Sequence, residues 1–152
     1  MDDCTATDRM TDLIGRKHGV LEQLRDLSRR QSDLIADADM ARLLSVLSAK
    51  QTLLAELQRI QQRLEPFRKQ DPEQRRWRCP EDRQRCALLV QRCENLLGEI
   101  MLVEKQSEAE LVHRRDAAVA GLEHSRSSAA AARAYLAPPP PQHRNLDLSS
   151  DT

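Results

Sequence analysis

The chain has 152 residues, and its 24 basic and 24 acidic side chains give a formal net charge of zero at pH 7. This balance leaves no global field that would attract nucleic acid or an anionic membrane, so neither is an expected partner. Leucine supplies 22 residues, whereas Phe67, Trp77 and Tyr135 are the only aromatic residues. Because sheets draw on β-branched and aromatic side chains, this composition predicts an all-α protein with leucine seams.

Apolar side chains at helical spacing predict a first helix over about residues 13–36. The polar residues before it are expected to be a frayed lead-in. Gly15 and Gly19 each cost a helix about 1 kcal/mol relative to alanine, so its first turns are expected to be loose. Asp37 or Asp39 is expected to cap the next helix, because a short carboxylate accepts the free amide protons at a helix start.

A second helix is predicted over about residues 39–65, and three apolar lines of seven-residue spacing run along it. The lines are Met40, Leu47 and Leu54; Leu43, Leu57 and Leu64, interrupted by Lys50; and Val46, Leu53, Ile60 and Phe67. Together they exceed what a two-helix seam needs, so this helix is expected to be central to a bundle or to meet a partner. A break is expected near Glu65, because Pro66 has no backbone N–H.

A third helix is predicted over about residues 81–135, with a seam that thins beyond Glu104. An antiparallel hairpin of the first two helices can cover only about half of its length. The remainder is expected to overhang, to be disordered or to be covered by another molecule, and the last two alternatives are preferred. The fold is therefore expected to be a coiled-coil-like helical bundle over residues 1–136, followed by a flexible, Pro-rich tail over residues 137–152.

Three cysteines, Cys79, Cys86 and Cys93, are spaced seven residues apart. Seven residues rise about 10.5 Å along a helix, so these thiols cannot share one metal ion or one disulfide. We expect them to be small buried side chains in a helix seam. The sequence also lacks a P-loop and an H-E-x-x-H pattern, and its four histidines are scattered. These observations predict a protein without cofactor, metal or catalytic residues, which is not an enzyme.

One basic segment, Arg75-Arg76-Trp77-Arg78, has the residue types that hold phosphate and stack a base. Asp71, Glu73, Glu81 and Asp82 surround it and dilute its field. The preferred interpretation is a solvated loop with Trp77 packed on the bundle. The polar N-terminus resembles no signal peptide, and no run of about 18 apolar residues suggests a membrane span. A cytoplasmic protein without membrane insertion is expected.

The segment from Leu24 to Leu64 reads LRDLSRRQSDLIADADMARLLSVLSAKQTLLAELQRIQQRL. It resembles the core of the flagellar export chaperones of the FlgN family, in which a leucine-patterned helix and a short acidic turn precede a helix of the form Leu-x-x-Leu-x-x-x-Lys-x-x-Leu-Leu-x-x-Leu. Leu43 or Leu44 begins the matching pattern, which continues through Leu47, Lys50, Leu53, Leu54 and Leu57.

The resemblance implies a cytoplasmic chaperone that binds the helical terminus of hook–filament junction proteins and delivers them to the type III export gate. The surplus apolar faces would bind the client, and the candidate residues are Val46, Leu53, Ile60, Phe67, Leu111, Val119 and Leu122. Tyr135 is the candidate contact to the export gate, and its alternative role is to pack on the bundle. The rival hypothesis is a structural coiled-coil scaffold, a homodimer whose second copy covers the same faces.

Overall fold

The computed structural model describes residues 3–138, and in this part of the chain three α-helices are joined by short connections. The helices are α1 (Asp3–Ala36), α2 (Met40–Arg68) and α3 (Pro80–Leu136), and a 3-10 turn, η1 (Pro72–Gln74), precedes α3. Residues 3–138 contain no strand, which confirms the predicted all-α fold of a helical hairpin plus a long third helix. Of the Pro-rich tail expected over residues 137–152, all but Ala137 and Pro138 lies outside the described residues.

The first turns of α1 are ordered helix, so the expected frayed lead-in is wrong. Thr7 is only 4% exposed, and its hydroxyl lies 2.9 Å from the backbone carbonyl oxygen of Arg76, to which it donates. Met10 belongs to the hydrophobic core. These contacts stabilise the polar start of α1, which the spacing of its apolar side chains does not predict to be a helix. Gly15 and Gly19 lie inside α1 without interrupting it.

The turn between α1 and α2 ends the first helix and caps the second. The amide of Asp39 donates to the carbonyl of Leu34 at 3.0 Å and the amide of Ala38 donates to that of Ile35 at 3.1 Å, the pattern that commonly closes a helix. Ala38 takes a left-handed conformation, with φ of 55°. Asp39 then caps α2, because its carboxylate accepts the amide proton of Arg42 at 3.2 Å. The predicted capping role is confirmed for Asp39.

The helix α2 continues past Pro66 and ends at Arg68, three residues after the expected break. Pro66 lies in the last turn, so its missing N–H removes one hydrogen bond without stopping the two residues that follow. Beyond this end, Arg75 donates from Nη2 to the carbonyl of Phe67 at 2.6 Å. This bond ties the connection back to the helix that it leaves.

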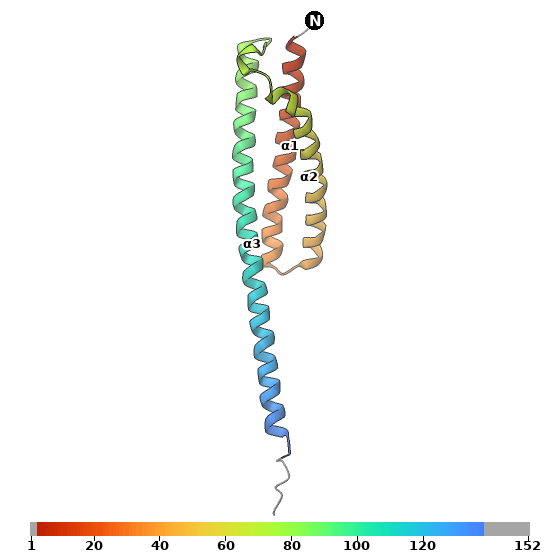
Figure 1. Cartoon of the computed structure of the whole chain (residues 1–152), viewed down its shortest axis with the longest axis vertical. Helices are drawn as coiled ribbons and strands as arrows, with labels where there is room; N and C mark the ends of the chain where they lie inside the picture. The colour runs from red at the N-terminus through yellow and green to blue at the C-terminus, as the bar shows by residue number, and fades with distance from the viewer. Residues whose placement is uncertain (1–2, 139–152) are drawn as a thin grey trace, which may run out of the picture. The chain divides into compact units, whose positions relative to one another are not determined.

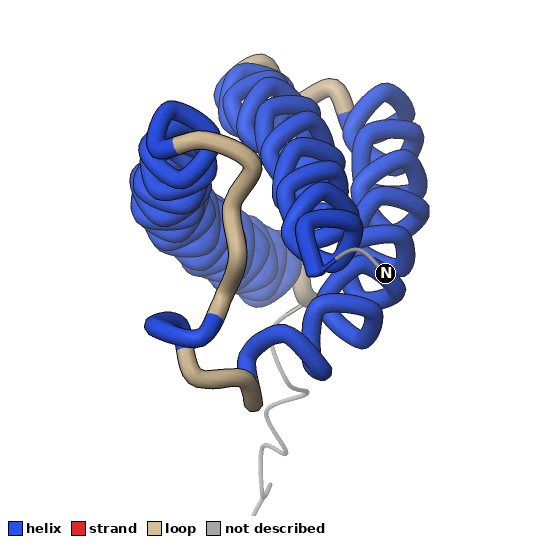
Figure 2. The backbone as a smooth tube through the Cα atoms, turned by 90° about the horizontal axis from the view of Figure 1, so that it is seen from above, coloured by secondary structure: helices blue, strands red, loops and turns tan. Residues whose placement is uncertain are grey.

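The central helix of the bundle is α1, so of the two alternatives for the second helix, the one in which it is central to the bundle is not observed. Of the 19 buried residues in the described part of the chain, α1 supplies 11, and α2 and α3 supply four each. Figure 1 shows α1 between α2 and the first half of α3, and the view from above in Figure 2 shows the same order. One side of α2 therefore packs on α1, and the side that faces away from the core carries the surplus leucines.

The chain divides into two compact units, Met1–His113 and Arg114–Thr152, where a single bundle over residues 1–136 was expected. The first unit contains α1, α2 and the part of α3 that packs on them. In the second unit the helix is formed up to Leu136, and every residue from Arg115 to Leu136 is exposed. The expected disorder of this stretch is therefore not observed.

Candidate helix-binding surface

The four client-binding candidates on α2 lie on the side of the helix that packs in the core. Val46 and Ile60 are 6% and 4% exposed, and both belong to buried clusters. Leu53 and Phe67 are partly buried and pack against the larger cluster. Their assignment to an open surface is corrected, because a client could not reach Val46 or Ile60 without unfolding the bundle.

A different line of α2 is exposed, and we call it the leucine face. Its apolar members Met40, Leu44, Leu47 and Leu54 are 48%, 68%, 38% and 51% exposed. Gln51 and Gln58 are also exposed and fall in the same series. The six positions alternate by four and three residues, which is the spacing of a coiled-coil seam. This face has the pattern of a helix–helix contact, although no partner helix lies on it within the described residues.

The border of the leucine face that lies away from the core carries no charge. Its residues are small or neutral, and all are exposed: Ala41, Ser48, Ala55 and Gln62. Charged residues make up 32% of the chain, and none of them falls on these four exposed positions. Small side chains let a second helix approach closely, and depletion of charge is typical of the centre of protein interfaces. The occupant that this surface fits is therefore a helix with an uncharged, apolar face.

The three candidates on α3 are accessible. Leu111, in the first unit, is 39% exposed and lines a hollow of about 690 Å³ together with Ile100 and Met101. Val119 and Leu122, in the second unit, are 49% and 58% exposed. Tyr135, also in the second unit, is 90% exposed.

A polar layer interrupts the apolar core, and it consists of Ser28, Gln31, Lys50 and Glu104. Lys50 of α2 forms an ion pair with Glu104 of α3 and donates to the side-chain oxygen of Gln31 at 2.6 Å. Ser28 of α1 donates to Glu104 at 2.8 Å, and Gln31 donates to it at 3.5 Å. The Lys50 side chain is only 11% exposed, so the charge that interrupts the second apolar line is enclosed and paired.

The surroundings of Glu104 change its pKa in opposing directions. Burial by itself raises the pKa of this carboxyl, because it disfavours the charged form. The hydrogen bonds from Lys50, Ser28 and Gln31, together with the charge of Lys50, outweigh burial and hold the pKa below its usual range. Glu104 is therefore an anion at neutral pH and compensates the enclosed ammonium group.

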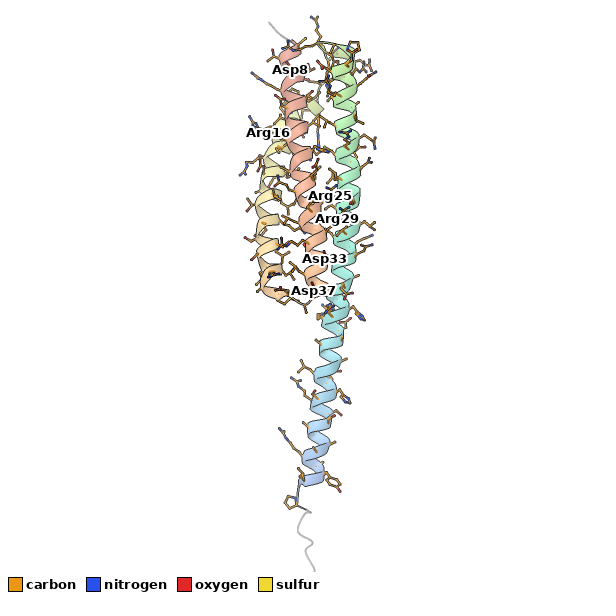
Figure 3. All side chains as sticks on the ribbon, turned by 180° about the vertical axis from the view of Figure 1, so that it is seen from behind. Asp8, Arg16, Arg25, Arg29, Asp33 and Asp37 are labelled. Carbon is orange, nitrogen blue, oxygen red and sulfur yellow. The ribbon has the colours of Figure 1, made fainter. Side chains whose placement is uncertain are left out.

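Charged side chains along α1 add ion pairs at the surface of the bundle. Arg29 pairs with Glu99 of α3, and Figure 3 shows Arg25 and Arg29 on the side of α1 that faces α3. Asp8 accepts from Arg78 of the connection at 2.8 Å. Such exposed pairs contribute little stability individually. Arg25 and Glu99 also line an open hollow of about 410 Å³ between α1 and α3.

The basic connection before α3 is engaged with the rest of the bundle. Trp77 packs against the larger hydrophobic cluster, as predicted. Arg75 and Arg78 bind the carbonyl of Phe67 and the carboxylate of Asp8. Arg75 and Arg78 therefore both bind other parts of the chain.

Two of the cysteines take the place predicted for them, because Cys86 and Cys93 are buried in the seam of α3. Cys79 precedes the helix and is half-buried, as is Cys4. Within residues 3–138 no three His, Cys, Asp or Glu side chains are grouped so that they could hold a metal ion. In the same residues no helix has the length and hydropathy needed to cross a membrane.

Comparisons with protein-family models, with curated proteins and with solved structures found no significant match to this chain. What this chain binds is therefore inferred from the surfaces described above and from the sequence pattern of Leu24 to Leu64.

Proposed function

We propose that this chain is a cytoplasmic export chaperone that binds an amphipathic helix of a client protein on the leucine face of α2. The observation that carries the proposal is the exposed seam of Met40, Leu44, Leu47 and Leu54 with its uncharged border. An ordered helix with an open apolar seam gives a partner helix anchor positions at the spacing that helix-in-groove recognition requires. The client is thus a helix whose contact face is apolar and uncharged.

The resemblance to flagellar export chaperones supplies the candidate client, the helical terminus of a hook–filament junction protein. Such a terminus would be kept from self-association while its apolar face is buried on the chaperone, and it would then be delivered to the type III export gate. Burial of apolar area contributes about 25 cal/mol per Å², which must exceed the entropy lost when the client segment becomes ordered. Leu111, Val119 and Leu122 are candidates for a second contact with the same client.

The first experiment mixes the purified full-length chain with C-terminal fragments of hook–filament junction proteins. A stable complex is expected, and a fragment with the same composition in scrambled order should not bind. Absence of a complex with every such fragment would contradict the proposal.

The second candidate function, a homodimeric scaffold, is favoured by the self-complementary character of the leucine face. Two antiparallel copies of an uncharged apolar seam could cover each other without repulsion. Sedimentation equilibrium of the chain alone separates the two functions. A monomer that becomes a 1:1 complex with the client supports the chaperone, whereas a tight dimer that binds no client supports the scaffold.

Tyr135 is proposed to contact the export gate, and its 90% exposure leaves its ring free to do so. In a Tyr135→Ala variant, client affinity should be unchanged while binding to the isolated gate component weakens. An equal loss of client binding would instead place Tyr135 in the client surface.

A further inference from the structure

The polar layer joins all three helices at one level of the first unit. Ser28 and Gln31 come from α1, Lys50 comes from α2 and Glu104 comes from α3, and every one of these residues bonds to another member of the layer. Ser28 and Gln31 are 1% and 5% exposed and the Lys50 side chain is 11% exposed, whereas the Glu104 side chain is 37% exposed, so the layer runs from the core to its margin.

Apart from this layer, the apolar pattern does not define a unique alignment of the helices. The inward positions Cys86, Cys93 and Ile100 of α3 repeat every seven residues, and the inward lines of α2 repeat with the same period. If α3 moved by seven residues, apolar side chains would again face apolar side chains. Hydrophobic burial alone therefore discriminates weakly between neighbouring alignments.

The two charges of the layer remove this ambiguity. Lys50 is the only charged residue on the inward lines of α2, and Glu104 is the only charged residue in the α3 seam between Cys86 and Ser107. A movement of seven residues shifts α3 by about 10.5 Å, which would separate the ammonium and carboxylate groups. The ammonium group of Lys50, whose side chain is 11% exposed, would then be enclosed without its partner, and an uncompensated buried charge is strongly destabilising.

We infer that the Lys50–Glu104 pair is a register lock, which fixes the alignment of α3 against the hairpin of α1 and α2. Its role is to exclude other alignments, and a well-packed apolar pair at the two positions would hold the helices together at least as firmly. The inference is independent of the client and of the leucine face.

Four isoleucines report on the alignment, because Ile14, Ile35, Ile60 and Ile100 are distributed over all three helices. In the full-length protein labelled with carbon-13 at the isoleucine δ1 methyl groups, a single alignment gives four methyl signals. The Lys50→Met, Glu104→Leu double variant should unfold at the wild-type temperature or above, yet show more than four signals. Four signals at wild-type positions in this variant would overturn the inference.

Two further variants sharpen the test. The exchanged pair, Lys50→Glu with Glu104→Lys, should again show four signals because the opposite charges still meet in one alignment. More than four signals in the exchanged pair would overturn the inference even if the apolar variant failed to fold. The matched control is Arg29→Met with Glu99→Leu, which removes an ion pair between α1 and α3 whose cation has a 57% exposed side chain, and it should leave four signals.

Discussion

The thiol of Cys93 in α3 lies 3.9 Å from the backbone carbonyl oxygen of Ile14 in α1. This contact joins the two helices inside the core. Cys93 is 2% exposed, and burial raises the pKa of its thiol, with a smaller opposing effect of Lys17. A neutral, enclosed thiol of this kind is a small apolar side chain that reacts slowly.

The first prediction concerns thiol reactivity. Cys93 should react with a thiol reagent only at the rate at which the bundle opens, because reaction requires an accessible thiolate. Cys4 and Cys79 are half-buried and should react earlier. Mass spectrometry of the native protein during labelling would show the order. Labelling of Cys93 together with Cys4 would contradict the packing of α3 on α1.

The second prediction concerns the turn that follows α1. Ala38 has φ of 55°, a conformation that costs an L residue about 1–2 kcal/mol and costs glycine much less. Ala38→Gly should therefore raise the free energy of unfolding by a few tenths to about 1 kcal/mol, as measured by denaturant titration.

A matched control for this prediction exchanges the same two residue types inside a helix. Gly19 has a negative φ, and a Cβ at this position would meet nothing within 4 Å. Gly19→Ala should also stabilise the protein, by about 1 kcal/mol, because alanine is the better helix residue. If Ala38→Gly destabilised the protein while Gly19→Ala stabilised it, the left-handed turn would be wrong.

The third prediction follows from the lowered pKa of Glu104. A carboxyl whose pKa is lower in the folded than in the unfolded state contributes stability above its unfolded pKa, ordinarily 4.5, and this contribution is lost as the pH falls through the folded pKa. The free energy of unfolding should therefore decrease below about pH 4.5. Glu104→Gln should show a weaker decrease, since its amide cannot take up the proton.

The control for the pH experiment is Glu99→Gln, which removes a half-buried carboxylate whose partner, Arg29, has a side chain that is 57% exposed. The wild-type unfolding profile should change less in this variant than in Glu104→Gln, because the exposed guanidinium group leaves this pair open to screening by solvent. Identical pH profiles of Glu104→Gln and wild type would show that the pair with Lys50 does not hold Glu104 in its charged form.

The helical fold could be predicted from the sequence because leucine spacing alone distinguishes a helix from a strand. The start of α1 could not be predicted, because Thr7 and its neighbours are held by the connection before α3, which is distant in sequence. Gly15 and Gly19 were expected to loosen the first turns of the helix. The helix is regular there because its tertiary contacts on both sides outweigh the low helix propensity of glycine.

The functional face of α2 could not be identified by counting leucines, because all three of its lines are apolar. Lys50 interrupts the line of Leu43, Leu57 and Leu64, and a charge is not expected in a core. The line nevertheless packs in the bundle, because Lys50 pairs with Glu104. The three apolar lines are distinguished by the residues that border each of them. Small neutral residues border the Met40, Leu47 and Leu54 line, and this border could have been noticed in the sequence.

The leucine face of α2 is proposed to bind a client helix, and a binding titration with variants of this face examines that contact. A fluorescently labelled C-terminal fragment of a hook–filament junction protein is titrated with wild type, with the Leu47→Glu, Leu54→Glu variant and with Leu88→Glu. Leu88, on α3, is 50% exposed, close to the 51% of Leu54, and lies outside the leucine face. All three proteins should unfold at similar temperatures, because the substituted side chains are exposed.

Burial of a leucine contributes about 1.5–3 kcal/mol, so loss of two contacts should weaken binding by more than tenfold. We predict this loss for the Leu47→Glu, Leu54→Glu variant and wild-type affinity for Leu88→Glu. Equal affinity of all three proteins for the fragment would contradict the assignment of the client site to α2.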